Sequence, residues 1–498
     1  MPLLPLKIPA GVSSVGTDLE SSGRWLDANL VRWTNGSLRP VGGWLEKYDT
    51  SASFTATPRK MHAWSDNSAT AHIAIGSASE LIHVDESGTA VDITPSGLTA
   101  GQDDGSVGSA FGGGNYGAGY YGTERVSSGV LQEADTWSLD NWGEYLVGCL
   151  TSDGKLYEWQ LDAATPTLAA QISNAPVDNK ACMVTEERFL FALGAGGNPR
   201  KVQWCDREDN TTWTPDATNE AGDIELQTNG EIMTGLRMRG RTLILTNVDA
   251  HIASYVGAPY VYGFERAGTA CGVASRIAAV ATDYGAFWMG NESFFMFDGS
   301  TVRRLSCEVQ DKVFDSVNRN QMTKVFAVHD ARHGEVWWFY PSSETTEIDS
   351  YVSFDYNENH WSVGSLERTC GVPRGVFDHP YWVDPTGVIY EHERLNLPHG
   401  GATPYAETAP INLGAGDQII KAVNLIGDED FAGQVDVTFK TRFHPNDTER
   451  DYGAYTLNGG ITSVRFTGRQ MRMRVEATGN DDFRVGVMRL EVQPGGKR

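Results

Sequence analysis

The chain has 498 residues and a formal net charge of −24, with 40 basic against 64 acidic side chains. Nearly all of the acidic excess lies in residues 1–400, because residues 401–498 hold 12 basic and 13 acidic side chains. Acidity of this size argues against tight nucleic-acid binding, which draws its affinity from neutralised phosphates. The 55 glycines and the lack of sustained helical periodicity predict an all-β protein built from many turns.

The cysteines and the apolar runs indicate where the protein is made. The six cysteines include no CxxC pair, which favours buried thiols in a reducing cytosol. No run reaches about eighteen apolar residues, so we expect no membrane insertion. The opening MPLLPLKIPAG is broken by prolines and lacks a basic stretch, which argues against a secretory signal.

Residues 1–35 predict an extended N-terminal arm, because their prolines hinder regular strand pairing. Trp25, Trp33 and Trp44 follow one another closely, and such aromatic clusters form core or interface more often than a ligand site. The Asn35-Gly36 pair predicts a tight hairpin turn. We also expect an N-terminal strand to close the propeller predicted below by pairing with its last blade.

Residues 36–395 repeat one pattern, in which short apolar strands are joined by turns that carry Asn, Asp and Gly. The clearest unit is Ala278–Leu305, where Gly290-Asn291 and Asp298-Gly299 separate three apolar runs. Similar units occur at His72–Ile93, Trp142–Trp159, Thr185–Trp204, Arg239–Val256, Val325–Trp361 and Tyr381–Tyr390. A small antiparallel sheet that recurs roughly every forty to fifty-five residues predicts an irregular β-propeller of about seven blades.

A long Gly-rich loop at about 95–130 interrupts the pattern. Its composition cannot bury much surface, so we expect it to be exposed at a blade edge. It lacks the GxxxxGK[ST] arrangement of a phosphate-binding loop. We therefore assign Gly112, Tyr116 and Tyr120 to contacts with a neighbouring subunit or a passing substrate, with plain flexibility as the alternative.

The stretch Glu308–Val317, within the predicted propeller, is the best helix candidate.

The C-terminal part differs from the rest. Residues Asn396–Thr408 are predicted to be a linker. Residues 405–498 alternate apolar and polar side chains, which predicts a small β-sandwich. On the polar face, Arg472 and Arg474 either meet an anionic partner or lie on a solvated face balanced by local acids.

No stretch nominates a catalytic, cofactor-binding or metal-binding residue. The segment Ser353–Trp361 approaches the aspartate box of sialidases but has one residue too many and Asn in place of Gly. His329 and His333 lie on a predicted hairpin, where a spacing of four does not bring both rings to one face. The QDDG of Gln102–Gly105 lacks the alternating oxygen ligands of a calcium loop. We expect no enzymatic activity and no cofactor.

Several stretches carry a resemblance to a known family. They are NLVRWTNGSLRPVGGW, GLRMRGRTLILTNVDAHIASYVG, the unit at 278–305 and YVSFDYNENHWSVGS. These stretches resemble the tail hub, or nozzle, proteins of short-tailed bacteriophages, also called DNA-stabilisation proteins. The order of the parts is also similar: an N-terminal arm, an irregular propeller and a C-terminal sandwich that ends in FRVGVMRLEVQPGG. The likeness spans most of the chain and is one of pattern.

The resemblance implies a structural virion protein of the tail, made in the host cytoplasm. Such proteins form a ring, usually a homohexamer, below the portal and its adaptor, and they meet tail fibre or tail tip proteins. They retain the packaged genome and conduct double-stranded DNA during ejection without binding it specifically. The acidic composition fits this role, since like charge along a lumen keeps a polyanion sliding.

Two other classes remain open from the sequence. The first is a propeller-type virion protein that binds or cleaves glycan, because propellers also serve as glycosidases. The second is a host-derived scaffold propeller, which would show more regular repeats than this chain does.

Overall fold

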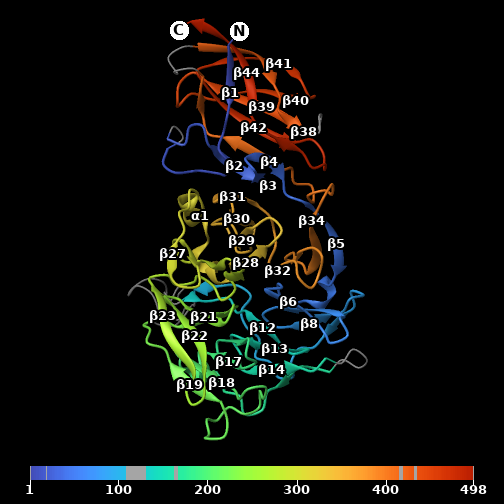
Figure 1. Cartoon of the computed structure of the whole chain (residues 1–498). Coiled ribbons are helices and arrows are strands. Elements are labelled where there is room, and N and C mark those ends of the chain that lie inside the picture. Colours follow the sequence, from blue (N-terminus) through green and yellow to red (C-terminus); the bar gives the residue numbers. More distant parts are fainter. Residues whose placement is uncertain are drawn as a thin grey trace, which may run out of the picture.

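The computed structural model describes residues 2–17, 20–107, 131–161, 167–413, 419–430 and 435–496. These residues form a seven-bladed β-propeller and a β-sandwich, with very little helix. Figure 1 shows the sandwich at one end of the molecule, where the N- and C-termini also lie, and the propeller at the other. The predicted all-β fold, an irregular propeller followed by a small C-terminal sandwich, is confirmed.

Each blade is a four-stranded antiparallel sheet. The first three blades consist of β6 (Lys60–Ser65), β7 (Ala71–Gly76), β8 (Leu81–Val84) and β9 (Ala90–Asp92); β12 (Trp137–Trp142), β13 (Tyr145–Leu150), β14 (Leu156–Trp159) and β15 (Ala170–Gln171); and β16 (Ala181–Val184), β17 (Leu190–Leu193), β18 (Lys201–Trp204) and β19 (Gly222–Glu225). The next three consist of β20 (Ile232–Met238), β21 (Arg241–Thr246), β22 (Asp249–Gly257) and β23 (Val261–Thr269); β24 (Ala279–Thr282), β25 (Gly285–Met289), β26 (Phe294–Phe297) and β27 (Val302–Arg304); and β28 (Phe326–Asp330), β29 (Glu335–Tyr340), β30 (Ser350–Asp355) and β31 (His360–Ser365).

The seventh blade is closed by the N-terminal part of the chain, as predicted. It contains β32 (Cys370–Val372), β33 (Tyr381–Val383) and β34 (Val388–Arg394), and its outermost strand is β5 (Gly43–Asp49). Ile389 lies opposite Tyr48 in this antiparallel pair. The first strands of neighbouring blades contact one another around the circle, so they form the inner wall of the propeller.

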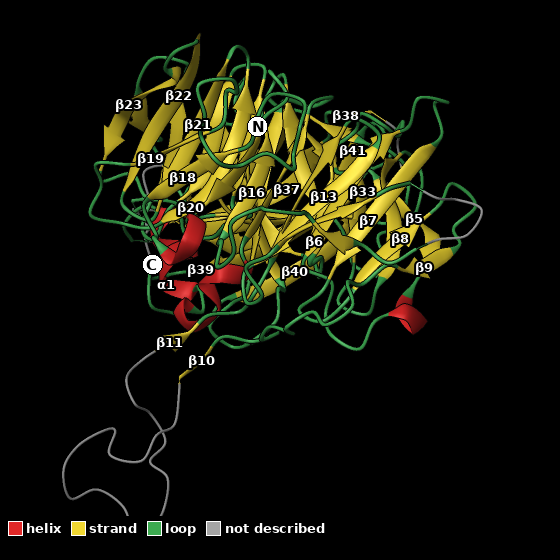
Figure 2. Ribbon diagram, turned by 90° about the horizontal axis from the view of Figure 1, so that it is seen from below, coloured by secondary structure: helices red, strands yellow, loops and turns green. Residues whose placement is uncertain are grey.

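Short elements lie between successive blades or between strands of one blade. They are the 3-10 turns η1 (Ser51–Ser53), η2 (Ala195–Gly197) and η3 (Arg319–Lys324), the pair β10 (Ser106–Val107) and β11 (Leu131–Gln132), and the helix α1 (Gln310–Ser316). Helix α1 confirms the predicted helix, and Val313 and Phe314 turn its apolar face to the core. Figure 2 shows β10 and β11 leaving the body of the molecule together.

The sandwich combines strands from both ends of the chain. Its sheets are β1 (Leu3–Leu6), β44 (Met488–Gly496), β37 (Ile419–Ile426) and β41 (Ile461–Gly468); β2 (Trp25–Asn29), β35 (Tyr405–Thr408), β42 (Gln470–Ala477), β39 (Val435–Arg442) and β40 (Arg450–Thr456), with β36 (Ile411–Asn412) also on β42; and β3 (Val31–Thr34), β4 (Ser37–Pro40), β43 (Arg484–Val485) and β38 (Glu429–Asp430).

The N-terminal residues therefore differ from the extended arm predicted over residues 1–35. Strand β1 pairs with β44 at the edge of its sheet, where Pro5 is tolerated because an edge strand needs hydrogen bonds on one side only. The Asn35-Gly36 turn joins β3 to β4 as predicted, with positive φ at both residues. The propeller consequently begins at β5 rather than at residue 36.

One apolar core runs from the sandwich into the fifth and sixth blades. Phe294 lies with its ring centroid 4.7 Å from that of Trp361 and 4.9 Å from that of Trp338. In the sandwich, Met471 and Met473 face this core from β42, in the period-two alternation predicted for that strand. The two parts are thus packed together and not strung on a free linker.

Candidate functional site

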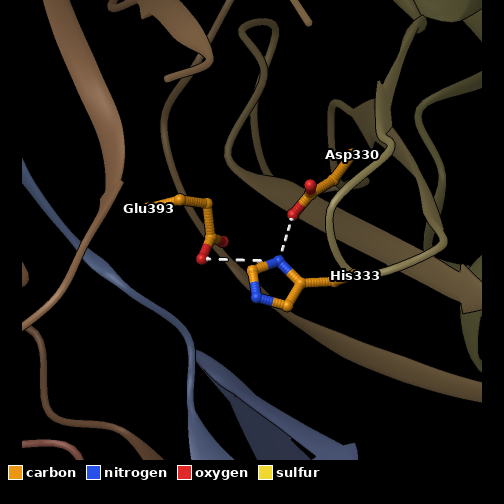
Figure 3. Close-up of side chains that lie close together, drawn as sticks. All are labelled: Asp330, His333 and Glu393. Carbon is orange, nitrogen blue, oxygen red and sulfur yellow. Dashed lines mark hydrogen bonds and ion pairs between the residues drawn. The ribbon is translucent and has the colours of Figure 1, made fainter. Parts of the chain in front are cut away.

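Asp330, His333 and Glu393 lie close together at the junction of the sandwich and the propeller (Figure 3). Asp330 ends β28, and its carboxylate accepts a hydrogen bond from the backbone N–H of Arg332, which fixes the turn into β29. Glu393 comes from β34 of the neighbouring blade. The packing of the seventh blade against the sixth therefore brings Glu393 to the Asp330 turn.

The three side chains have the geometry of a possible cation site. His333 Nδ1 lies 2.6 Å from Asp330 Oδ2 and 3.8 Å from Glu393 Oε2. One imidazole and two carboxylates are a ligand set that transition metals accept. Whether the set can hold a metal depends on what else its oxygens contact.

The sandwich supplies a cation of its own, the guanidinium of Arg32 from β3. Arg32 donates to both oxygens of Glu335 at 3.0 and 2.9 Å and to both oxygens of Glu393 at 2.8 and 2.7 Å. Asp330 Oδ2 lies 3.6 Å from Arg32 Nη2. Since Arg32 is only 5% exposed, a metal would have to displace a buried, fully bonded arginine. The residues do not fit a metal centre.

The electrostatics agree with a fixed ion-pair network. Burial alone would lower the pKa of Arg32, but Glu335 and Glu393 raise it well above its ordinary value. Burial alone would raise the pKa of Asp330, but the hydrogen bond from His333 and the charge of Arg32 lower it to about 2. Burial raises the pKa of Glu335, against the pull of Arg32. Arg32 and Asp330 therefore stay charged across the physiological range.

The network also lacks the parts of a hydrolytic site. In the described part of the chain, no serine, threonine or cysteine side chain is hydrogen-bonded to His333. The arrangement can hold β3 of the sandwich against two blades at once, and its geometry supports this structural role.

Sequence reasoning singled out none of the three carboxylates that pair with Arg32, which are Asp330, Glu335 and Glu393. His333 was considered with His329, but the two rings have separate partners, since His329 Nε2 lies 2.9 Å from the hydroxyl of Tyr356. No local sequence pattern identifies Glu393 as part of a site, because its partners come from another blade and from the sandwich. Only the Asp330-to-His333 turn could have been anticipated from the residues alone.

The three predicted tryptophans are structural. Trp25 and Trp33 are buried between the sandwich and the sixth blade, with ring centroids 6.0 Å apart. Trp44 lies on β5 against His392 and under the guanidinium of Arg368, which is 5.1 Å from its ring. The first two help to join the two parts of the molecule, whereas Trp44 packs within the seventh blade.

The other predicted interface residues divide into two groups. Gly112, Tyr116 and Tyr120 lie outside the described residues. Arg472 is paired with Glu449 at 2.8 Å, and Arg474 is paired with Glu476 at 2.9 Å while stacking on the ring of Tyr405. This arginine face of β42 is therefore balanced by neighbouring acids.

The acidic stretch Gln102–Gly105 is likewise occupied by protein cations. Asp103 lies 3.0 Å from the buried guanidinium of Arg59, and Asp104 is paired with the buried ammonium of Lys324. Arg59 belongs to the first blade and Lys324 to the connection into the sixth. The stretch therefore links the first blade to the segment that leads into the sixth.

Within the described residues, no helix is long and apolar enough to cross a membrane.

Comparisons with known proteins identify no family for this chain. No family model matches the chain, and no curated protein sequence matches it significantly. Similar solved structures include a streptogramin B lyase (8% identity, TM-score 0.40, covering 68% of this chain and 93% of that one). They also include the β-propeller domain of Cps50 (Swd1) from Myceliophteria thermophila (9%, 0.39, 71% and 99%) and the WD40 domain of Pan2 from Neurospora crassa (7%, 0.40, 74% and 98%). Likeness this remote says nothing about activity.

Proposed function

We propose that the chain is a non-enzymatic ring subunit of the tail hub, or nozzle, of a short-tailed bacteriophage. In this role it lies below the portal and adaptor, retains the packaged genome and conducts DNA during ejection. The observation that carries the proposal is an unusually long, open strand edge on the fourth blade, which favours assembly with further copies.

The edge is formed by β23, a strand of nine residues. The outermost strands of five other blades, β9, β15, β19, β27 and β31, have 3, 2, 4, 3 and 6 residues. The longest of these, β31, is covered by the sandwich, where Ser362 donates to the carbonyl of Val31. Among the described residues, only β22 pairs with β23. A long free edge is a template for pairing with another chain.

The tip of the same hairpin is apolar and exposed. Val256 is 58% exposed and Tyr260 is 80% exposed. Both views place β22 and β23 at the margin of the molecule (Figures 1 and 2). The seven-residue β5 is also an outermost strand and presents Glu46 and Lys47, and β23 itself carries the exposed charges Glu265 and Arg266, so β23 is distinguished by its length and by the apolar tip of its hairpin. A neighbouring subunit would cover the unprotected tip at β23.

The DNA path in this proposal is the lumen between copies. The stretch from Gly101 to Val107 is fixed to the first blade and to the segment before the sixth by its contacts with Arg59, Lys324 and Gln321. The acidic excess of residues 1–400 suits a lumen through which DNA must pass without being bound tightly. Adaptor, portal and tail fibre or tail tip proteins are the partners in this proposal.

A reconstitution tests the proposal. The purified chain is mixed with the adaptor–portal complex of the same phage, and the product is imaged by negative staining. The proposal predicts an added ring coaxial with the adaptor. A chain that leaves the adaptor bare at every ratio tested would overturn it.

A further inference from the structure

A groove of about 610 Å³ opens between the fourth, fifth and sixth blades, beside the turn that carries Asp330, and no residue of β23 lines it. It is lined by the turn between β20 and β21, the turn between β24 and β25, and the turn between β26 and β27, with His329 from β28. A hollow of this size, with a few converging polar groups, is the usual form of a small-ligand site.

The wall from the fourth blade is cationic. Arg237 is already neutralised, because it donates to both oxygens of Asp140 at 2.7 and 2.8 Å. Arg241 is held in place by a bond of 3.1 Å to the carbonyl of Gly299. No hydrogen bond or ion pair joins Arg239 to any residue that the structure describes. Arg239 and Arg241 therefore offer guanidinium donors to the groove.

The opposite wall, from the fifth blade, is anionic. Asp283 and Asp298 line it. Backbone N–H groups of Thr301 and Ser300 lower the pKa of Asp298 to about 2, so this side chain stays a carboxylate. The groove thus has a donor side and an acceptor side.

An aromatic ring also lines the groove. Tyr284, at the turn after β24, is 61% exposed, and its ring centroid lies 5.0 Å from that of Tyr356. Tyr356 in turn stacks on Phe287, with centroids 5.6 Å apart. The Tyr284 ring is therefore backed by other rings on one side and open on the other. Such a ring presents an apolar face and a polar tip at once.

From this combination we propose that the groove binds a carboxylate-bearing sugar, such as a uronic acid unit of a polysaccharide. The sugar carboxylate pairs with Arg239 and Arg241, hydroxyl groups donate to Asp283 and Asp298, and the C–H face of the ring packs on Tyr284. A phosphorylated ligand with two charges fits less well, because the acidic wall repels it.

An array of uronic-acid oligosaccharides and neutral oligosaccharides of the same length, probed with the purified full chain, tests this inference. We expect binding to acidic members only, followed by calorimetry on the best of them. Arg239→Ala and Tyr284→Ala should each weaken binding about tenfold or more, since each removes a charged or stacking contact. Tyr284→Phe should bind nearly as the wild type does, because it keeps the ring.

Arg207→Ala, which removes an exposed arginine far from the groove, is the matched control and should leave binding unchanged. Circular dichroism of each variant shows that it is folded. Equal binding of neutral sugars, undiminished binding by both alanine variants, or no binding to any member at millimolar concentration would overturn the inference. Each of these results leaves the ring proposal untouched, because β23 takes no part in the groove.

Discussion

The guanidinium of Arg32 lies 2.7 Å from a carboxylate oxygen of Glu393, a residue 361 positions further along the chain. Arg32 belongs to the sandwich and Glu393 to the last blade, so this pair joins the two parts of the molecule. The same guanidinium also holds Glu335 on the sixth blade. Three segments far apart in sequence are thus fixed by one side chain.

Replacing this arginine should be strongly destabilising. Arg32→Met leaves Asp330, Glu335 and Glu393 buried without their cation, and removal of one partner of a buried pair typically costs about 3–5 kcal/mol. The free energy of unfolding, measured by urea denaturation, should fall by that amount. Arg332→Met, an exposed change in the adjoining turn, should alter it by less than about 0.5 kcal/mol. Equal stabilities of the two variants would contradict the assigned role of Arg32.

Trp288 in β25 tests the packing between blades. It is fully buried, and its indole N–H donates to the carbonyl of Cys271 at 2.8 Å. Trp288→Ala should cost about 3–5 kcal/mol through the cavity it leaves, and it should weaken assembly along with folding. Calorimetric unfolding compared with Val177→Ala, an exposed control, gives the measurement. A melting temperature equal to that of the control would show that Trp288 does not carry this packing.

The lowered pKa of His83 in β8 predicts that the protein loses stability in mild acid. Burial and the neighbouring His72 lower the pKa of His83 to about 4. The unfolded chain takes up a proton near pH ~6.5, whereas the folded chain does so only near its lowered pKa. The free energy of unfolding should therefore fall as the pH drops from about 6.5 to about 4.

The variant His83→Gln isolates this effect. It should reduce the difference in unfolding free energy between pH 7 and pH 4.5 by about 2 kcal/mol, because Gln does not titrate. Urea denaturation of both proteins at the two pH values gives the comparison. An identical pH dependence in wild type and variant would rule out His83 as its source.

Turn chemistry made the propeller predictable. Asn-Gly and Asp-Gly pairs, as at Asp298-Gly299 in the fifth blade and at Asn35-Gly36 in the sandwich, impose backbone conformations that few other residues adopt, so hairpins can be found locally. Strand β1 was missed because it is short, contains Pro5 and pairs with β44 at the other end of the chain. Such pairing depends on tertiary context that no local pattern encodes.

The charged junction was less predictable than the fold. Arg32 and Glu335 occupy strands whose neighbouring residues are apolar, and nothing in the sequence links them to each other or to Glu393. Their proximity follows from the closing of the seventh blade by β5 and from the docking of β3 on β31. A site assembled from three segments becomes visible only once the topology is known.

The central claim is that this chain forms a ring through the open edge of β23, and native mass spectrometry tests it most directly. The wild type should give a closed assembly whose mass is a whole multiple of 54.3 kDa. Val256→Asp combined with Tyr260→Asp should give mainly monomer, while Val177→Asp should assemble as the wild type does. A wild type that stays monomeric at every concentration, or a double variant that assembles fully, would contradict the account.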